Sequence, residues 1–315
     1  ISSLFLAGDV RANENIFLSA MHTLFVREHN RLCDQIVNDF PQFAGQDEMI
    51  FQHVRRHVYG IMQSITYQEF LPALLGSNTP DAWKHYDSSV HPGISIEFST
   101  AFYRLGHSML SSNLKVGTDG NINLMDAFFK PEYIQEFGID KLLQGAFLQR
   151  MQEIDGEIVD DVRNNLFGPP TSGHLLDLAT LNIQRGRDHG LPNYNTCREA
   201  YALARKNSFA EVTSDASVQV KLASVYDTVD DIDPWIGALV EDHVPGAAVG
   251  ELICEALKEQ FERLQISDRF WFENDAALSE QEKESIRNTT LADVIRRNTS
   301  LSNGDVPDDV FHLPI

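Results

Sequence analysis

Hydrophobic residues recur every three to four positions along most of this chain, which is the spacing of a helix that buries one face. Proline lacks the amide proton that a helix interior requires, so Pro72 is expected to end the helix predicted over residues 51–70. Strand-like alternation is nearly absent, and we therefore expect little sheet. The pattern predicts helices over residues 21–37, 51–70, 96–110, 139–152, 157–166, 179–185, 195–206, 217–225, 250–264 and 279–287.

Clusters of glycine, proline and asparagine mark the loops between these helices. No repeat of fixed period and no low-complexity segment interrupts the pattern, and no loop is long enough to link separate domains. We therefore expect a mainly α-helical protein with a single large domain over residues 1–315. The predicted loops cover residues 76–80, 117–121, 168–170 and 303–307.

The 315 residues include 46 acidic and 25 basic side chains, which gives a formal net charge of -21. This excess disfavours nucleic acid and anionic membranes as partners, because both attract clustered lysine and arginine. No apolar run approaches the length that crosses a bilayer. The chain opens at Ile1 without a start methionine or a basic segment, so we expect it to be trimmed, processed or incomplete at this end.

Cysteine and asparagine residues give weaker signals. The three cysteines are too few and too scattered for a disulfide framework, although a bridge between Cys197 and Cys254 is left open. Asn288 and Asn298 each begin a triplet that fits the N-glycosylation pattern, but such triplets often arise by chance.

Several common catalytic motifs are absent from the sequence. No histidine follows a glutamate by three positions, which excludes the ligand motif of di-iron helical bundles. There is also no His-Glu-x-x-His motif, no Gly-x-Ser-x-Gly motif, no Walker loop and no Gly-x-Gly-x-x-Gly run.

Arginine instead recurs three residues from another polar group in three segments, a spacing that puts both side chains on one helix face. One partner is a carboxylate, one an imidazole and one a neutral amide. Together they suggest a single buried site for a ligand with anionic groups and a centre that imidazole can bind. Haem fits this description. The pairs are Arg11 with Glu14, Arg104 with His107, and Arg185 with Asn182.

Taken one at a time, these residues leave other interpretations open. Gly106 removes a side chain beside His107, where something large could approach the backbone. A histidine in an apolar segment is nevertheless more often a hydrogen-bonded core residue than a ligand. Asn182 interrupts an apolar helix, and an imidazole N–H would satisfy its carbonyl oxygen. Arg11 and Glu14 alone would more often form an exposed ion pair.

Taken together, the segments resemble the animal-type haem peroxidases of the peroxidase–cyclooxygenase superfamily. The resemblance runs in the family's order from Phe5 to about Phe311, and it is closest to the secreted microbial members. The runs that carry it are Ala7-Gly8-Asp9-x-Arg11-x-x-Glu14, His22-Thr23-Leu24-x-x-Arg27-Glu28-His29-Asn30-Arg31, Arg104-x-Gly106-His107, Leu181-Asn182-Ile183-Gln184-Arg185-Gly186-Arg187-Asp188-His189-Gly190 and Asp268-Arg269-Phe270-Trp271-Phe272-Glu273-Asn274.

The resemblance implies haem b as the cofactor and a catalytic set around it. His107 would be the proximal ligand of the iron and the metal-binding residue of the chain. Asn182 would accept a hydrogen bond from the other ring nitrogen and so fix the tautomer. Arg11 would polarise bound peroxide and stabilise negative charge.

Further residues would hold the cofactor. Glu14 matches the carboxylate that forms an ester with a haem methyl group. Arg104 and Arg185 would pair with the haem propionates, because a guanidinium fork suits a carboxylate. The implied cofactor-binding set is Arg11, Glu14, Tyr103, Arg104, His107, Leu178, Leu181, Asn182 and Arg185.

Two departures from the family pattern narrow the expected chemistry. Asn15 stands where the chloride-oxidising mammalian member has a methionine linked to haem, so strong chloride oxidation is disfavoured. Arg104 occupies the position of the radical tyrosine of cyclooxygenases. Tyr103 is displaced from it by one residue, about 100° around a helix, so fatty-acid oxygenation is disfavoured.

The largest departure concerns residues that the family places before the Ala-Gly-Asp run. These are the distal histidine and its neighbouring glutamine, an aspartate that forms a second ester, and the calcium ligands. None is in this chain, so we expect the N-terminal distal segment to be absent and calcium to lack its ligands here. A separate segment or chain would then be a partner.

The resemblance implies an extracellular peroxidase that uses hydrogen peroxide to oxidise halide, thiocyanate or phenolic donors through a ferryl intermediate. Its activity would depend on the absent segment. The alternatives are a peroxidase-homology module without catalysis, used in adhesion or assembly, and a haem-binding fragment. Such modules tend to lose the proximal histidine or the distal arginine, whereas His107 and Arg11 are both present.

Overall fold

The computed structural model describes residues 4–166 and 176–313. Helices dominate these residues, and one short hairpin supplies the strands found among them, as the sequence predicts. Contacts divide the chain into two compact units, each built from separate stretches of sequence. Unit 1 comprises Ile1–Phe70, Asn113–Arg150 and Arg269–Ile315, and unit 2 comprises Leu71–Ser112 and Met151–Asp268.

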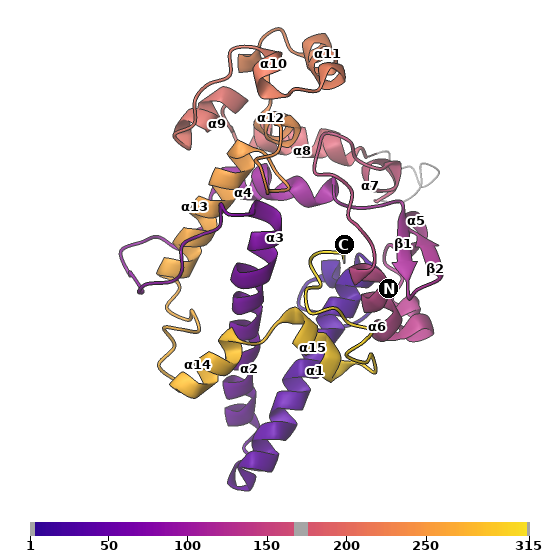
Figure 1. The fold of residues 1–315 in the computed structure, drawn as a ribbon, viewed down its shortest axis with the longest axis vertical. Coiled ribbons are helices and arrows are strands. Elements are labelled where there is room, and N and C mark those ends of the chain that lie inside the picture. Colours follow the sequence, from indigo (N-terminus) through magenta and orange to yellow (C-terminus); the bar gives the residue numbers. More distant parts are fainter. Residues whose placement is uncertain (1–3, 167–175, 314–315) are drawn as a thin grey trace. The chain divides into compact units, whose positions relative to one another are not determined.

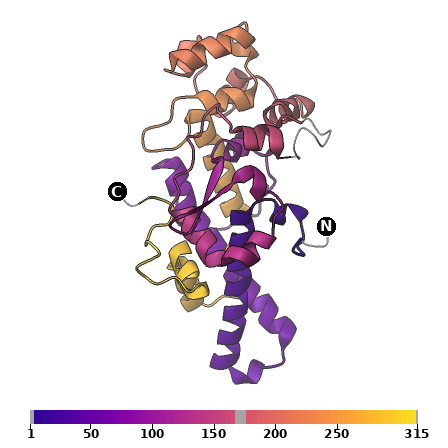
Figure 2. The same cartoon turned by 90° about the vertical axis from the view of Figure 1, so that its right-hand side faces the viewer.

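Unit 1 is organised by two long helices, α1 (Ile16–Asp39) and α2 (Asp47–Ile65), joined by the short turn η2 (Pro41–Phe43). Figures 1 and 2 show them as a helical hairpin. Both bury an apolar stripe, as expected of amphipathic helices. Its other elements are η1 (Val10–Asn13), η3 (Thr66–Phe70), β1 (Asn113–Val116), β2 (Gly120–Asn123), α5 (Leu124–Ala127), α6 (Glu132–Phe147), α14 (Glu280–Arg287) and α15 (Leu291–Asn298).

The β-hairpin of unit 1 packs closely against α6. Strands β1 and β2 are antiparallel, with Leu114 opposite Ile122. Gly145 of α6 allows the close approach, since a Cβ atom there would lie 1.9 Å from the carbonyl oxygen of Lys115. Any side chain at this position would therefore separate α6 from β1.

Unit 2 packs mostly shorter helices around an apolar core that also contains a buried ion pair. Arg198 is 1% exposed and forms a buried ion pair with Glu241, whose carboxylate also accepts a 2.6 Å hydrogen bond from the hydroxyl of Tyr194. Its elements are α3 (Leu71–Leu75), α4 (Ile96–Thr100), η4 (Phe102–His107), α7 (Asp160–Asn165), α8 (Leu178–Asp188), α9 (Tyr194–Ala200), α10 (Phe209–Val212), α11 (Ala216–Val225), η6 (Val229–Asp231), α12 (Pro234–Val240) and α13 (Glu251–Ser267).

The structure corrects three of the predicted helices. Pro72 does not end helical structure, because the chain passes without a break from the π-helix η3 into α3, whose second residue is Pro72. The segment 96–110 is broken at Ala101 into α4 and the 3-10 helix η4. The helix predicted over 195–206 ends at Ala200, since Ala202 takes a left-handed backbone conformation with φ 59.

The predicted loops agree with the structure in part, and some helices were not predicted. Chain turns occur in the loops predicted at 76–80 and 303–307, whereas β2 takes up part of the loop predicted at 117–121. The loop predicted at 168–170 lies outside the described residues. The helices α12 and α15 are not among the predicted segments.

The cysteine bridge left open by the sequence is not formed. Cys197 and Cys254 are free thiols, each buried in unit 2 within its own helix. Burial raises the pKa of both thiols to about 12, so they remain protonated at neutral pH.

The two glycosylation triplets differ in access. Asn288 is exposed at the end of α14. The amide nitrogen of Asn298 instead donates to the buried carboxylate of Glu28 at 2.7 Å and to the carbonyl oxygen of Val294 at 2.8 Å. The nitrogen that would carry a glycan is therefore engaged at Asn298.

Candidate active site

The 3-10 helix η4 positions Arg104 and His107 in unit 2. Phe102 and Leu105 anchor its buried side, with 1% and 3% of their surface exposed. A 3-10 helix has about three residues per turn, so Arg104 and His107 lie on the same face. Ser108 then fixes the end of the turn, because its hydroxyl donates to the carbonyl oxygen of Glu153 at 2.9 Å.

Helix α8 brings Asn182 to this face. The carboxylate of Asp177 caps the helix by accepting from the amide of Thr180 at 2.9 Å. Leu178 and Asn182 follow one turn apart, and both are buried, with Asn182 0% exposed. Leu181 is half-buried on the same helix.

Three predicted residues meet in one hydrogen-bonded chain. Nδ2 of Asn182 lies 2.9 Å from Nδ1 of His107, and Nη1 of Arg104 donates to Oδ1 of Asn182 at 2.9 Å. Since the imidazole, the amide and the guanidinium are linked in series, the orientation of each depends on the other two.

The polarity of this chain differs from the one that the resemblance implies. In the predicted arrangement the amide oxygen of Asn182 accepts a hydrogen bond from the ring of His107, whereas here the amide nitrogen faces the ring. The cause is Arg104, because a guanidinium has only donors and therefore takes the amide oxygen. The predicted polarity requires the Arg104 guanidinium to bond to another acceptor, such as a carboxylate.

His107 is suited to bind a metal centre. Burial, followed by the charge of Arg104, lowers its pKa to about 4, so the ring is neutral at physiological pH. Only Nδ1 of its ring has a hydrogen-bond partner among the described residues. Nε2 is therefore the nitrogen left for a ligand.

Two arginines beside this ring lack acidic partners. Burial and the nearby charge of Arg185 lower the pKa of Arg104. Within the described ranges, neither guanidinium lies within ion-pair distance of a carboxylate. Arg187, the next arginine on α8, shows the contrast, since it pairs with Asp233 at 2.7 Å. Two adjacent and unpaired guanidinium groups in so acidic a chain favour an anionic ligand.

The surroundings of His107 leave room on one side. Gly106 is exposed, and a Cβ atom added there would meet no atom within 4 Å. Tyr103 is 42% exposed and stacks on Phe98, with ring centroids 4.6 Å apart. Because η4 is a 3-10 helix, Tyr103 is rotated about 120° from Arg104 rather than the 100° expected of an α-helix.

Arg11 and Glu14 lie in unit 1, on and just after η1. The side chain of Arg11 is 77% exposed and pairs with Asp9, to which its Nε donates at 2.9 Å. This corrects the i,i+3 pairing with Glu14. The backbone carbonyl of Glu14 accepts from the amide of Phe129 at 3.0 Å. Burial raises the pKa of the Glu14 carboxyl more than Arg11 lowers it.

The structure thus joins Arg104, His107 and Asn182 in unit 2 and places Arg185 near them. These residues fit one axial side of a haem and its carboxylates, because they offer a neutral imidazole, two unpaired guanidinium groups and open space beside Gly106. Arg11 and Glu14 belong to unit 1, where each makes its own contacts.

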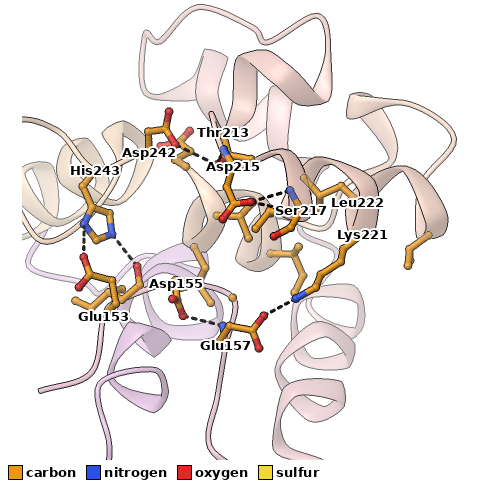
Figure 3. Close-up of a pocket in the computed structure, with 18 of the residues that line it drawn as sticks. Glu153, Asp155, Glu157, Thr213, Asp215, Ser217, Lys221, Leu222, Asp242 and His243 are labelled. Atoms are coloured by element: carbon orange, nitrogen blue, oxygen red, sulfur yellow. Dashed lines mark hydrogen bonds and ion pairs between the residues drawn. The ribbon is translucent and has the colours of Figure 1, made fainter.

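A different pocket of unit 2, of about 530 Å³, contains none of the predicted residues. Figure 3 shows that its charged groups bind one another. Lys221 pairs with Glu157, and Nε2 of His243 contacts the carbonyl oxygen of Ile154 at 2.8 Å. Asp215 caps α11. We interpret these contacts as structural.

The described residues present an imidazole joined through a buried amide to one guanidinium, with a second guanidinium near the first. The sequence model described as animal haem peroxidase matches residues 1–311. The chain belongs to this family. Among the described residues, no helix is both long and apolar enough to span a membrane.

The relatives include proteins named peroxidases. Peroxinectin A of Dictyostelium discoideum is 37% identical over 99% of this chain and 58% of its own length. Lactoperoxidase of Mesocricetus auratus is 36% identical over 95% of this chain and 44% of its own length. This chain therefore spans less than two thirds of both relatives.

Solved structures share the fold. Peroxidase A from Dictyostelium discoideum superposes with a TM-score of 0.89 at 35% identity, over 98% of this chain and 59% of that one. A fatty acid alpha-dioxygenase of Oryza sativa reaches a TM-score of 0.80 at 21% identity, over 98% of this chain and 59% of that one. The second match shows a common fold alone.

Proposed function

We propose that this chain forms the haem-ligating part of a peroxidase that oxidises small anionic or phenolic donors with hydrogen peroxide. The observation that carries the proposal is the chain of hydrogen bonds from Arg104 through Asn182 to His107, beside the unpaired Arg185. Family membership supports it, as do the relatives named peroxidases.

The residues of unit 2 would bind and orient the cofactor. His107 would hold haem through Nε2, and haem would supply the redox chemistry when bound. Arg104 and Arg185 would hold its carboxylates. Once a carboxylate engages Arg104, the amide of Asn182 is free to turn and accept from Nδ1 of His107. This turn gives His107 the tautomer that ligation requires.

The residues of unit 1 would serve the peroxide side. Arg11 would stabilise negative charge on the reacting oxygens. Glu14 would tether the cofactor through an ester to a haem methyl group, with hydrogen peroxide as the two-electron oxidant that takes up the methyl hydrogen. The base that moves the peroxide proton, and any calcium ligands, are assigned to sequence beyond these 315 residues, since the relatives are longer. We place the protein outside the cell, as suggested by its likeness to peroxinectin A and lactoperoxidase.

The proposal is tested by adding haem to the purified chain, alone and after co-expression with the upstream part of Dictyostelium peroxidase A. We expect a Soret band in both samples. Thiocyanate or phenol turnover should be at least roughly 100-fold higher with the added segment, which is the lower end of what a positioned proton-transfer group contributes.

Two results would contradict the proposal. A chain that gains no haem absorption would be an apo scaffold for adhesion or assembly. Full turnover by the isolated chain would show that its own residues supply the base, and the role given to the upstream segment would be wrong.

A further inference from the structure

Two histidines and a glutamate of unit 1 converge where α14 packs on α2 (Figure 1). His53 and His57 lie one turn apart on α2, so both rings project from the same face. Glu282 comes from the first turn of α14. One ligand atom from each of the three residues lies within 4.8 Å of the other two.

Glu282 divides its two oxygens between two tasks. Oε2 accepts from the backbone amide and the hydroxyl of Ser279, both at 2.7 Å, and completes the cap of α14. Oε1 faces the histidines, 2.9 Å from Nε2 of His53 and 3.3 Å from Nε2 of His57. The cap therefore fixes the carboxylate in a position to bind something between itself and the rings.

The contact between His57 and Glu282 is not explained by a simple hydrogen bond. Nδ1 of His57 lies 3.2 Å from the carbonyl oxygen of His53, an acceptor, so Nδ1 carries a proton. In a neutral ring Nε2 then has a lone pair, and that lone pair faces the Glu282 oxygen. A cation between these two atoms would satisfy both of them.

The side chain of His57 is only 14% exposed. A metal ion would accept the lone pair of its Nε2 and balance the charge of the Glu282 carboxylate.

The geometry matches the demands of a transition metal. A tetrahedral zinc ion bound at about 2.1 Å separates its ligand atoms by about 3.4 Å. The separation of Glu282 from His57 is 3.3 Å, and that from His53, at 2.9 Å, would have to lengthen slightly. The Nδ1 contact of His57 with a backbone carbonyl is the second interaction that metal-binding histidines usually make. Two imidazoles also select zinc-like ions over magnesium or calcium.

We propose that His53, His57 and Glu282 form a binding site for a divalent transition metal ion, with Zn²⁺ the best fit. Three protein ligands leave a fourth position for water. Because two ligands come from α2 and one from α14, the ion would tie the C-terminal part of unit 1 to its long helical hairpin. This role is independent of haem.

The test is a titration of the purified chain with Zn²⁺ alone, followed by isothermal calorimetry and by two-bond ¹H–¹⁵N spectra of the histidine rings. We expect one strong site, with Nε2 of His53 and His57 shifting on saturation. The substitutions His57→Gln and Glu282→Gln should each weaken binding by more than the roughly 10–100-fold that loss of an outer-shell partner costs.

The controls separate ligation from folding. Glu282→Gln preserves the cap of α14, because glutamine also serves in a capping box. His22→Gln removes an exposed histidine of α1 in the same unit and should leave the affinity unchanged. Unshifted Nε2 resonances at saturating Zn²⁺, or parental affinity in both site variants, would overturn the proposal.

Discussion

The candidate site residues of unit 2 and those of unit 1 are held in different ways. In unit 2, His107 is fixed through the buried Asn182 to Arg104, and η4 is anchored by buried aromatic and aliphatic side chains. In unit 1, Arg11 is mostly exposed and bonds to Asp9, two residues away. The unit 2 groups are preorganised by tertiary contacts, whereas the Arg11 side chain is held by its local turn.

This difference suggests separate roles, with the residues of unit 2 determining haem binding and those of unit 1 determining the reaction that follows. A metal ligand must be oriented before the cofactor arrives, and buried hydrogen bonds provide that orientation at little further cost in entropy. A group that meets a small reactant can be ordered later by other parts of the protein. Changes in unit 2 should therefore alter haem affinity, and changes in unit 1 should alter what happens once haem is bound.

His107→Gln should have the largest effect. Glutamine can keep a hydrogen bond to Asn182 but does not replace the imidazole as an iron ligand, so haem affinity should fall by at least roughly 100-fold, or about 2.7 kcal/mol. Soret titration measures this loss. His189→Gln, at the exposed end of α8, is the matched control. Equal affinity in the His107 variant would remove this residue from the site.

Glu14→Gln should abolish covalent attachment while leaving most of the affinity. The Glu14 carboxyl is half-buried and has no hydrogen-bond partner among the described residues, so it is available to form an ester. We expect part of the haem to remain with the parent chain through denaturing chromatography and none to remain with the variant. The exposed Glu136→Gln serves as control. Similar retention in both variants would contradict the link.

Asn182→Asp should shift the reduction potential. A carboxylate pushes more electron density through the imidazole than a neutral amide, which stabilises ferric iron. The potential should fall by roughly 60 mV, a tenfold change for one electron. Gln184→Glu adds the same charge at an exposed position of α8 and should leave the potential nearly unchanged. Equal potentials in the Asn182→Asp variant and the parent would exclude this coupling.

The sequence predicted the elements that depend on local pattern. The long helices α1, α2 and α13 follow from the spacing of apolar residues, which is a property of short segments and needs no coordinates. The pairing of His107 with Asn182, 75 positions apart, was instead implied by the resemblance to the family.

Other features depend on contacts that a linear pattern does not contain. The polarity of Asn182 is set by Arg104, which lies 78 positions away. The 3-10 form of η4 depends on the packing of Phe102 and Leu105. The spacing of His53 and His57 was a visible signal for a metal pair, but Glu282 lies 229 positions from His53.

The smallest expected effect is a pH dependence that belongs to unit 2. The pKa of His107 falls from 6.5 to about 4 on folding, so between these values the unfolded chain binds more protons than the folded one. The free energy of unfolding contributed by His107 should therefore decrease as pH falls from 6.5 to 4, and stay constant above 6.5. Because the ring is partly exposed, we expect a loss on the order of 1–2 kcal/mol.

Urea denaturation at several pH values measures this loss, and His107→Gln should show a shallower slope than the parent or His189→Gln. Parallel slopes in all three proteins would mean that the ring titrates normally, and that the buried chain to Arg104 does not set the residues of unit 2 apart from those of unit 1.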